Sequence, residues 1–365
     1  MVSNSSNRLL GAGALAGLLL LAIAATPREA GTQTDVRIGV QTSGTNKSPL
    51  LLATFRAAGN AAGTAGGARD VTRSDFELSG LFTVRDVPAL ESKLNPEPGL
   101  AGSVRVEGLV EPEGPGWKLT GEVFDLGTAE SVFRRAYSFD RSTLRATLHR
   151  FSDDVIEALT GERGICETPI AFVRHSGKAK EIWVMDYDGE NQRQVTHDRS
   201  IALSPAWAPW GSEIAFTTFK RGNPDLYLFD LRRGASYPFS TRPGLNTAPS
   251  YSPDGKWVAC TLSRDGNAEI YLVSRDAQTA RRLTRNPRID SSPCFSPTGR
   301  ELVFTSDRSG SPQLYVMDTD GVNQRLLTME GKYNDSAQWS PKGEKIVYAA
   351  RHDGTVDVVI IDSNG

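Results

Sequence analysis

The side chains that could do chemistry are few and scattered along this chain. Its four histidines are His149, His175, His197 and His352. They are not spaced as the ligands of one metal ion would be. His149 falls on the polar side of an expected helix, so we expect it to be solvated. The sequence contains no G-x-S-x-G elbow, H-E-x-x-H motif or G-x-x-x-x-G-K-[ST] loop. It therefore predicts neither an enzyme nor a bound cofactor.

Two acidic turns come closest to a metal motif. Asp186-x-Asp188-Gly189 and Asp318-x-Asp320-Gly321 resemble the start of a calcium loop, but they lack its third acidic position and its closing glutamate. Both stand at the same place in a repeat, which favours ordinary turn chemistry. A cation in a central channel is the alternative, with Asp290 and Asp335 facing it. No metal site is predicted.

The chain has three cysteines, an odd number: Cys166, Cys260 and Cys294. Cys260 takes a position that is aromatic in the sister repeats, so we interpret it as a small core residue. A disulfide between Cys260 and Cys294 is the alternative in an oxidising compartment. The net charge of −2, from 41 basic and 43 acidic residues, argues against nucleic acid or an anionic membrane as the partner.

A 44-residue repeat organises the second half of the chain. Its clearest marker is an aromatic residue, followed in most copies by Ser-Pro-x-Gly, at Trp207, Tyr251, Phe295 and Trp339. Such a period, built of short strands and turns, is typical of β-propeller blades. We expect four strands per blade: the aromatic-Ser-Pro strand innermost, then the Ile-Ala-Phe, Ile-Tyr-Val-Met-Asp and Arg-Leu-Leu-Thr types. The aromatic residue should pack between blades, and the glycine should form a turn.

The first half predicts a small α/β domain. Three strand candidates form a meander at 103–110, 117–124 and 131–137. A helix is expected over 142–160, capped by Asp140 or Ser142 and ended by Gly161. Further expected elements are a strand at 36–40, a helix from 50, a loop or frayed segment over 57–68, and a helix over 70–80.

The N-terminus has the pattern of an export signal. Arg8 precedes an apolar run from Leu9 to Ala24, which ends in an A-x-A site. A retained membrane anchor is the alternative, but it needs about 20 apolar residues. We therefore expect a signal peptide over 1–24, an α/β domain with a flexible N-terminal tail over 25–164, and a propeller over 165–365. The repeats stop inside the fifth copy, so we expect a truncated chain.

This combination resembles the TolB family of the Tol-Pal system. The resemblance rests on Glu157-Ala-Leu-Thr-Gly-Glu162, Tyr251-Ser-Pro-Asp-Gly255, Leu314-Tyr-Val-Met-Asp318, Ser79-Gly-Leu-Phe82 and Val106-Glu-Gly-Leu-Val110. It implies a six-bladed propeller, of which this chain covers about four and a half blades. It also implies a non-enzymatic periplasmic scaffold of Gram-negative bacteria that supports outer-membrane integrity and cell division.

The resemblance implies two partners, the lipoprotein Pal and TolA, with other outer-membrane proteins as a further option. Pal would bind loops at the propeller mouth, at Leu203, Ser204, Asn246, Thr247, Ala248, Asp290, Ser291, Ser292, Asn334, Asp335 and Ser336. TolA would bind the tail, at Ala25, Thr26, Pro27, Arg28 and Glu29. Leu245 departs from the family pattern, which has a polar residue or histidine there. The alternative function is a truncated prolyl-peptidase-like hydrolase.

Overall fold

The computed structural model describes residues 47–91, 94–352 and 355–365. The predicted signal peptide, the tail and the strand at 36–40 lie outside the described residues. The first part is a mixed sheet in the order β3-β1-β4-β5-β6, with β2 beside β4. Its strands are β1 (Ser48–Ala53), β2 (Arg56–Ala57), β3 (Phe82–Val87), β4 (Val104–Glu113), β5 (Gly116–Asp125) and β6 (Ser131–Phe139). The predicted meander is confirmed as β4, β5 and β6.

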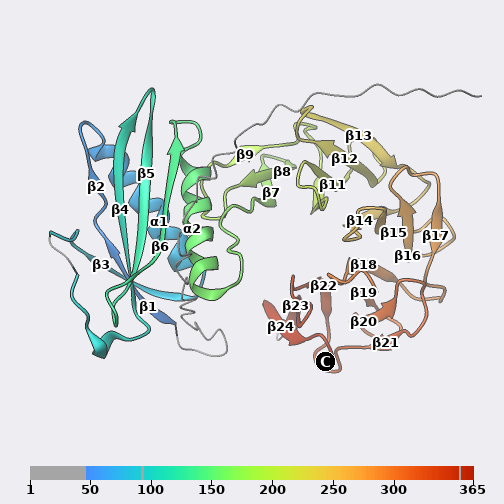
Figure 1. Cartoon of the computed structure of the whole chain (residues 1–365). Coiled ribbons are helices and arrows are strands. Elements are labelled where there is room, and N and C mark those ends of the chain that lie inside the picture. The colour runs from blue at the N-terminus through green and yellow to red at the C-terminus, as the bar shows by residue number, and fades with distance from the viewer. Residues whose placement is uncertain (1–46, 92–93, 353–354) are drawn as a thin grey trace, which may run out of the picture. The chain divides into compact units, whose positions relative to one another are not determined.

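Two helices, α1 (Ala62–Leu78) and α2 (Leu144–Thr160), pack against each other and on this sheet (Figure 1). The core between them includes Phe76 from α1 and Phe151 from α2. Phe151 reaches the sheet because β5 has a glycine beneath it: a Cβ on Gly121 would stand 2.3 Å from the Phe151 ring. A short 3-10 turn, Pro98–Leu100, leads into β4.

Two predictions in this domain are wrong. The leucine-rich segment from residue 50 is strand β1, not a helix, because it pairs in parallel with both β3 and β4 and buries Leu50 and Leu52 completely. The glycine- and alanine-rich stretch over 57–68 is not a loop, since α1 starts at Ala62. Alanines at 61, 65 and 68 form its buried face, where small side chains allow close packing.

The start of α2 also differs from the prediction. Thr143 is the N-cap residue, one position after Ser142 and three after Asp140. Asp140 instead closes the preceding turn, where its Oδ1 accepts hydrogen bonds from the backbone N–H groups of Ser142 and Thr143 at 2.8 and 2.9 Å. The C-terminal prediction is confirmed, because Gly161 ends the helix with φ of 76°.

The second part is a β-propeller of five antiparallel sheets. Figure 1 shows them ranged about a common centre, with β14, β18 and β22 inside and β13, β17 and β21 outside. The three four-stranded sheets are β10 (Ala202–Trp207) to β13 (Ala235–Ser240), β14 (Asn246–Tyr251) to β17 (Ala280–Arg282), and β18 (Asp290–Phe295) to β21 (Arg325–Leu326). Their middle strands are β11 (Glu213–Thr218), β12 (Asp225–Asp230), β15 (Trp257–Leu262), β16 (Glu269–Ser274), β19 (Glu301–Ser306) and β20 (Gln313–Asp318).

The first and last sheets have three described strands each. The first contains β7 (Ile170–Ser176), β8 (Ala179–Met185) and β9 (Arg193–Gln194), and the last contains β22 (Asn334–Trp339), β23 (Lys345–His352) and β24 (Thr355–Asp362). Strand order in the complete sheets confirms the predicted sequence from inside to edge. One detail is corrected: the aromatic residue ends the innermost strand, and Ser-Pro belongs to the turn that follows.

The repeated features of the blades behave as predicted. The turn glycines Gly211, Gly255, Gly299 and Gly343 all have positive φ, between 69° and 81°. Each aromatic residue packs on the preceding blade; Phe295, for example, lies in one cluster with Ile270 and Leu272. This placement confirms its role between blades.

All three cysteines are buried and free, so the alternative of a Cys260–Cys294 disulfide is wrong for this structure. Burial raises the pKa of the Cys260 thiol to about 12, which keeps it protonated. Among the described residues, no helix is long and apolar enough to cross a membrane. The predicted domain boundary at residues 164 and 165 falls in the connection between α2 and β7.

Candidate functional site

A cavity of about 500 Å³ lies where the innermost strands β10, β14, β18 and β22 meet. We call it the central cavity. Its lining residues are Ser204, Pro205, Ala206, Trp207, Ala248, Pro249, Ser250, Tyr251, Ser292, Pro293, Cys294, Phe295, Ser336 and Gln338. None of these is an aspartate, glutamate, histidine, lysine or arginine. Burial raises the pKa of the two titratable groups in the lining, the Tyr251 phenol and the Cys294 thiol, so both stay neutral.

The shape of the central cavity comes from a bulge that recurs in each innermost strand. Pairing with the second strand shifts register at the same place in all four blades. The residue at the bulge has a left-handed backbone although it is not glycine: Ser204, Ala248 and Ser292 have φ of 52°, and Ser336 has 58°. A β-bulge re-aims the chain locally. Here it brings the predicted residues Ser204, Ala248, Ser292 and Ser336 to the cavity wall.

The structure corrects where the predicted Pal-binding residues lie. They are not in loops, because they form the first three positions of innermost strands. Asn246, Asp290 and Asn334 are at most 1% exposed, so their side chains are not accessible to a partner. The other eight are half-buried or exposed: Leu203, Ser204, Thr247, Ala248, Ser291, Ser292, Asp335 and Ser336. For these eight, partner binding stays a prediction.

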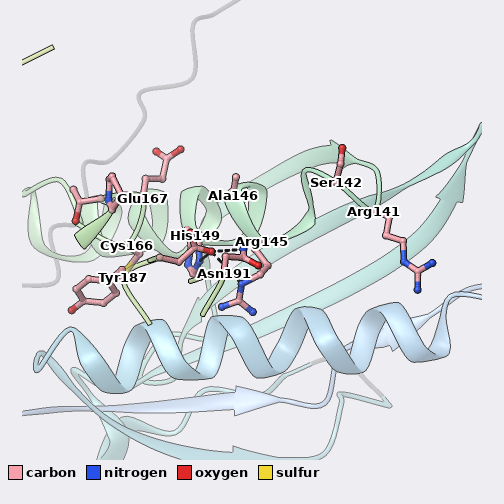
Figure 2. Close-up of a pocket in the computed structure, with 12 residues that line it drawn as sticks. Arg141, Ser142, Arg145, Ala146, His149, Cys166, Glu167, Tyr187 and Asn191 are labelled. Carbon is pink, nitrogen blue, oxygen red and sulfur yellow. Dashed lines mark hydrogen bonds and ion pairs between the residues drawn. The ribbon is translucent and has the colours of Figure 1, made fainter. Parts of the chain in front are cut away.

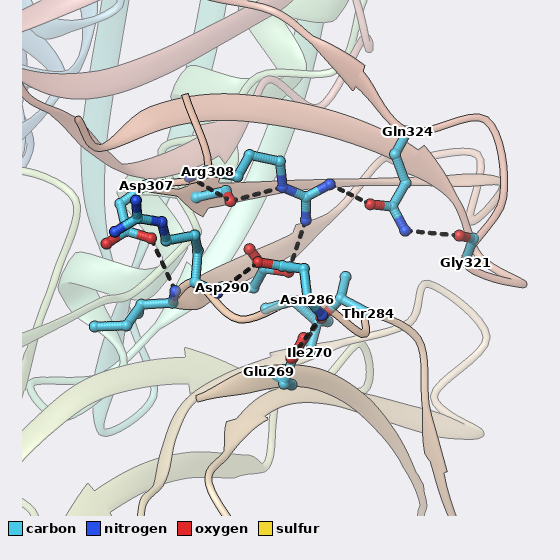
Figure 3. A network of polar contacts seen from close by, with 12 residues as sticks. Glu269, Ile270, Thr284, Asn286, Asp290, Asp307, Arg308, Gly321 and Gln324 are labelled. Atoms are coloured by element: carbon cyan, nitrogen blue, oxygen red, sulfur yellow. Dashed lines mark hydrogen bonds and ion pairs between the residues drawn. The ribbon is translucent and has the colours of Figure 1, made fainter. Parts of the chain in front are cut away.

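Figure 3 shows what Asp290 does instead. Its Oδ2 accepts hydrogen bonds from Arg308 at 2.7 Å and from Asn286 at 2.6 Å. The backbone N–H of Asn286 in turn donates to Glu269 of the neighbouring blade at 3.1 Å. This network joins two blades, and Asp290 is not among the residues that line the central cavity.

Asp335 is similarly engaged, by the hydroxyl of Thr305 at 2.8 Å. The cavity lining therefore gives no support to the alternative of a channel cation held by Asp290 and Asp335.

Three exposed apolar side chains directly precede innermost strands, and the sequence reasoning missed them as a set. Ile201, Leu245 and Ile289 directly precede β10, β14 and β18, and they are 38%, 41% and 54% exposed. We call these three residues the apolar rim. Single exposed apolar side chains are ordinary, but a repeated set around one cavity is typical of an interaction surface. The sequence contains a signal for this set, because the three residues are spaced by the same period as the repeats.

A second polar site lies where α1, α2 and the β8–β9 turn meet, and it overturns the prediction for His149. That residue is only 3% exposed, not solvated. Its Nδ1 lies 2.9 Å from Asp75 Oδ1, because the two helices pack with these positions facing each other. Burial alone would lower the pKa of His149, but the hydrogen bond and charge of Asp75 outweigh it and raise that pKa.

The acidic turn of the first blade completes this second site. Arg145 of α2 forms ion pairs with both Asp186 and Asp188. Tyr187 between them donates a hydrogen bond to the carbonyl of Leu78 at 2.9 Å. The turn chemistry itself is confirmed, since Asn191 and Asn323 make the same contact to Asp186 and Asp318, at 2.7 and 2.6 Å.

Comparison with known proteins decides the family. A family model described as TolB beta propeller domain matches residues 156–365. The chain belongs to the TolB family. The TolB protein of Acinetobacter baumannii, a crystal structure, superposes with a TM-score of 0.76 at 29% identity, over 88% of this chain and 81% of that one.

Curated TolB relatives agree. The Tol-Pal system protein TolB of Nitrosomonas europaea is 36% identical over 241 residues, which cover 64% of this chain and 55% of the relative. The Protein TolB homolog of Chlorobium chlorochromatii is 33% identical over 208 residues, which cover 54% and 47%. This chain thus spans about half the length of the curated relatives it matches. The five tail residues from Ala25 to Glu29 lie outside the described residues.

Proposed function

We propose that this TolB-family chain is a non-enzymatic periplasmic scaffold of the Tol-Pal system. Its propeller mouth would bind Pal, and its N-terminal tail would bind TolA. Through these two contacts the protein would support outer-membrane integrity and constriction during division. The observation that carries the proposal is the apolar rim around an uncharged cavity. Such a surface suits docking of a folded partner better than chemistry.

Calorimetric titration with the periplasmic domain of Pal from the same organism tests the mouth. The test variant carries Thr247→Glu with Ser291→Glu, two half-buried positions beside the cavity-lining bulges. Unpaired carboxylates placed in a desolvated interface should cost several kcal/mol, so we expect saturable binding that this variant loses.

The matched control adds two negative charges at the opposite ends of the same blades. Gln278→Glu lies in the β16–β17 turn, and Thr298→Asp reproduces the residue found at Asp254 one repeat earlier. This control should bind like the parent chain. Equal binding by all three proteins would move the Pal site away from the mouth, and no binding by a folded parent chain would contradict the Pal assignment.

The TolA contact is tested separately. Removing residues 25–29 should abolish binding to TolA while leaving the Pal titration unchanged. Retained TolA binding by the shortened chain would show that the tail is not the TolA site.

A further inference from the structure

The second polar site contains more buried negative charge than its one arginine balances. Asp75 is fully buried, and the Asp188 side chain is 4% exposed. With Asp186 they make three carboxylates, against the single guanidinium of Arg145. A neutral His149 would leave two negative charges without a counterion. Buried charge without a partner is costly, so a bound cation, or a proton on His149 or Asp75, must offset it.

His149 presents an empty coordination position to the same cluster. Its Nδ1 faces both oxygens of Asp75, at 2.9 and 3.0 Å, while its buried Nε2 has no hydrogen-bond partner. Asp186 Oδ2 lies 3.7 Å from Nε2, beyond hydrogen-bond range. Figure 2 shows His149 beside Arg145 and Asn191. These residues help to line a pocket of about 250 Å³.

The distances suit a shared metal ion. Carboxylate oxygens of Asp75 and Asp188 and a ring nitrogen of His149 all lie within 4.8 Å of one another. Two ligands bound to one zinc ion at about 2.0–2.2 Å stand roughly 3–3.5 Å apart, close to the separation of Nε2 and Asp186. A histidine that ligates a metal commonly donates its other N–H to a carboxylate. Asp75 is placed to accept that hydrogen bond.

We propose that this cluster is a binding site for a divalent transition-metal ion of the zinc type. His149 Nε2 and the carboxylates of Asp186 and Asp188 are its ligands, and Asp75 orients the imidazole. One imidazole with carboxylates favours zinc-type ions over calcium, which takes six to eight oxygens. The ion would join α2 to the turn of the first blade. Arg145 would then lose part of its ion pairing with that turn.

The experiment measures binding of Zn²⁺ alone to the untagged protein by calorimetry and equilibrium dialysis with metal analysis. We expect one ion per chain. Asp75→Asn should weaken the affinity by about 10–100-fold, the usual effect of removing an orienting carboxylate. His149→Gln and Asp188→Asn should weaken it at least as much, and Ca²⁺ should not compete.

The repeat supplies a matched control. Asp320 occupies the position of Asp188 in the β20–β21 turn of the fourth sheet, which has the same internal hydrogen bonds. Asp320→Asn should leave the affinity for Zn²⁺ unchanged. Circular dichroism establishes that each variant is folded.

Two results would overturn the proposal. One is that the protein does not bind Zn²⁺, or that all four variants bind it as tightly as the parent chain does. The other is a nitrogen NMR spectrum in which His149 keeps a proton on Nε2 in the presence of excess Zn²⁺ at pH 7.5. In that case an imidazolium, not a metal, supplies the positive charge.

Discussion

At the scale of single residues, the propeller uses a strained backbone position to fix neighbouring blades. A left-handed conformation costs a non-glycine residue about 1 kcal/mol or more. The backbone N–H groups of the bulge residues Ala248 and Ser292 donate to the hydroxyls of Thr217 and Thr261 of the preceding blade, at 3.2 and 3.1 Å. In β14 and β18 the strain is thus offset by hydrogen bonds that tie the innermost strand to the blade before it.

Asp140 allows a pH prediction at this scale. Hydrogen bonds from Ser142 and Thr143 lower the pKa of its carboxyl to about 2, from 3.8. A lowered pKa means that the carboxylate stabilises the fold above about pH 4, and that this contribution is lost as the pH falls through 2.

Carboxyl-carbon NMR should give a midpoint near 2 for Asp140. The exposed Asp320, in a different turn, serves as a comparison measured in the same spectrum. A midpoint near 4 for Asp140 would show that its turn does not form in solution.

The residue scale is also where sequence reasoning failed most. Repeat spacing predicted one equivalent residue of each blade at the cavity wall, Ser204, Ala248, Ser292 and Ser336, because one period places every copy alike. The other predicted mouth residues do not line the cavity. His149 was expected in solvent because its helix face is polar. Its partner Asp75 lies 74 residues away on another helix. Only the packing of α1 on α2 brings the two together, and neither segment carries a local signal of it.

At the scale of elements, helices and strands were predictable where their pattern was local. The meander, α2 and the blade strands follow from periodicity and turn residues. Strand β1 was mistaken for a helix because Leu50 and its neighbours favour a helix in isolation. In the folded protein they lie between β3 and β4, and pairing with both strands makes this segment a strand. The predicted helix over 70–80 is confirmed as the second half of α1. The first half of α1 was missed because its glycines disfavour a helix, while its buried alanines give only a weak apolar signal.

Two glycine-to-alanine changes should act in opposite directions. Gly66 lies inside α1 with open space around its Cα, so Gly66→Ala should stabilise the protein by about 0.5–1 kcal/mol. Gly121→Ala would place a methyl group against the Phe151 ring, so we expect a loss of about 1–3 kcal/mol.

Urea denaturation measures both changes, and each variant is the other's control because the chemical change is identical. A Gly121→Ala variant as stable as the parent chain would show that α2 does not pack this closely on β5.

At the scale of the whole molecule, the propeller mouth combines the apolar rim with basic loops. The exposed charged residues of the mouth loops include Lys178, Arg199, Arg221, Arg264, Asp265, Arg285, Arg288, Glu330 and Lys332. Basic residues outnumber acidic ones in this set, although the whole chain has a net charge of −2. An acidic partner surface would therefore approach this face faster, and its association should slow as salt is added.

Removing one side chain of the apolar rim should weaken that association. Ile289→Ser exposes no new charge and truncates a side chain that is already 54% exposed, so the fold should be little affected. We expect the binding free energy for Pal to become less favourable by about 1–2 kcal/mol, as is usual when one apolar contact residue of an interface is truncated.

Val322→Ser is the control, because Val322 is 52% exposed but lies in the β20–β21 turn at the other end of its blade. Titration of both variants with the periplasmic domain of Pal gives the answer. Equal losses for both would mean that the effect is not specific to the mouth.

The packing of each aromatic residue on the preceding blade has a consequence for synthesis. Phe295 completes the cluster around Ile270 and Leu272, yet it is translated after all the strands of their blade. A ribosome adds about 5–20 residues per second, so a 44-residue repeat takes roughly 2–9 s. Each of the first four blades therefore leaves the ribosome with its last hydrophobic contact missing, and it waits some seconds for the next repeat to supply it. During that interval its open side is the natural place for a holding chaperone to bind.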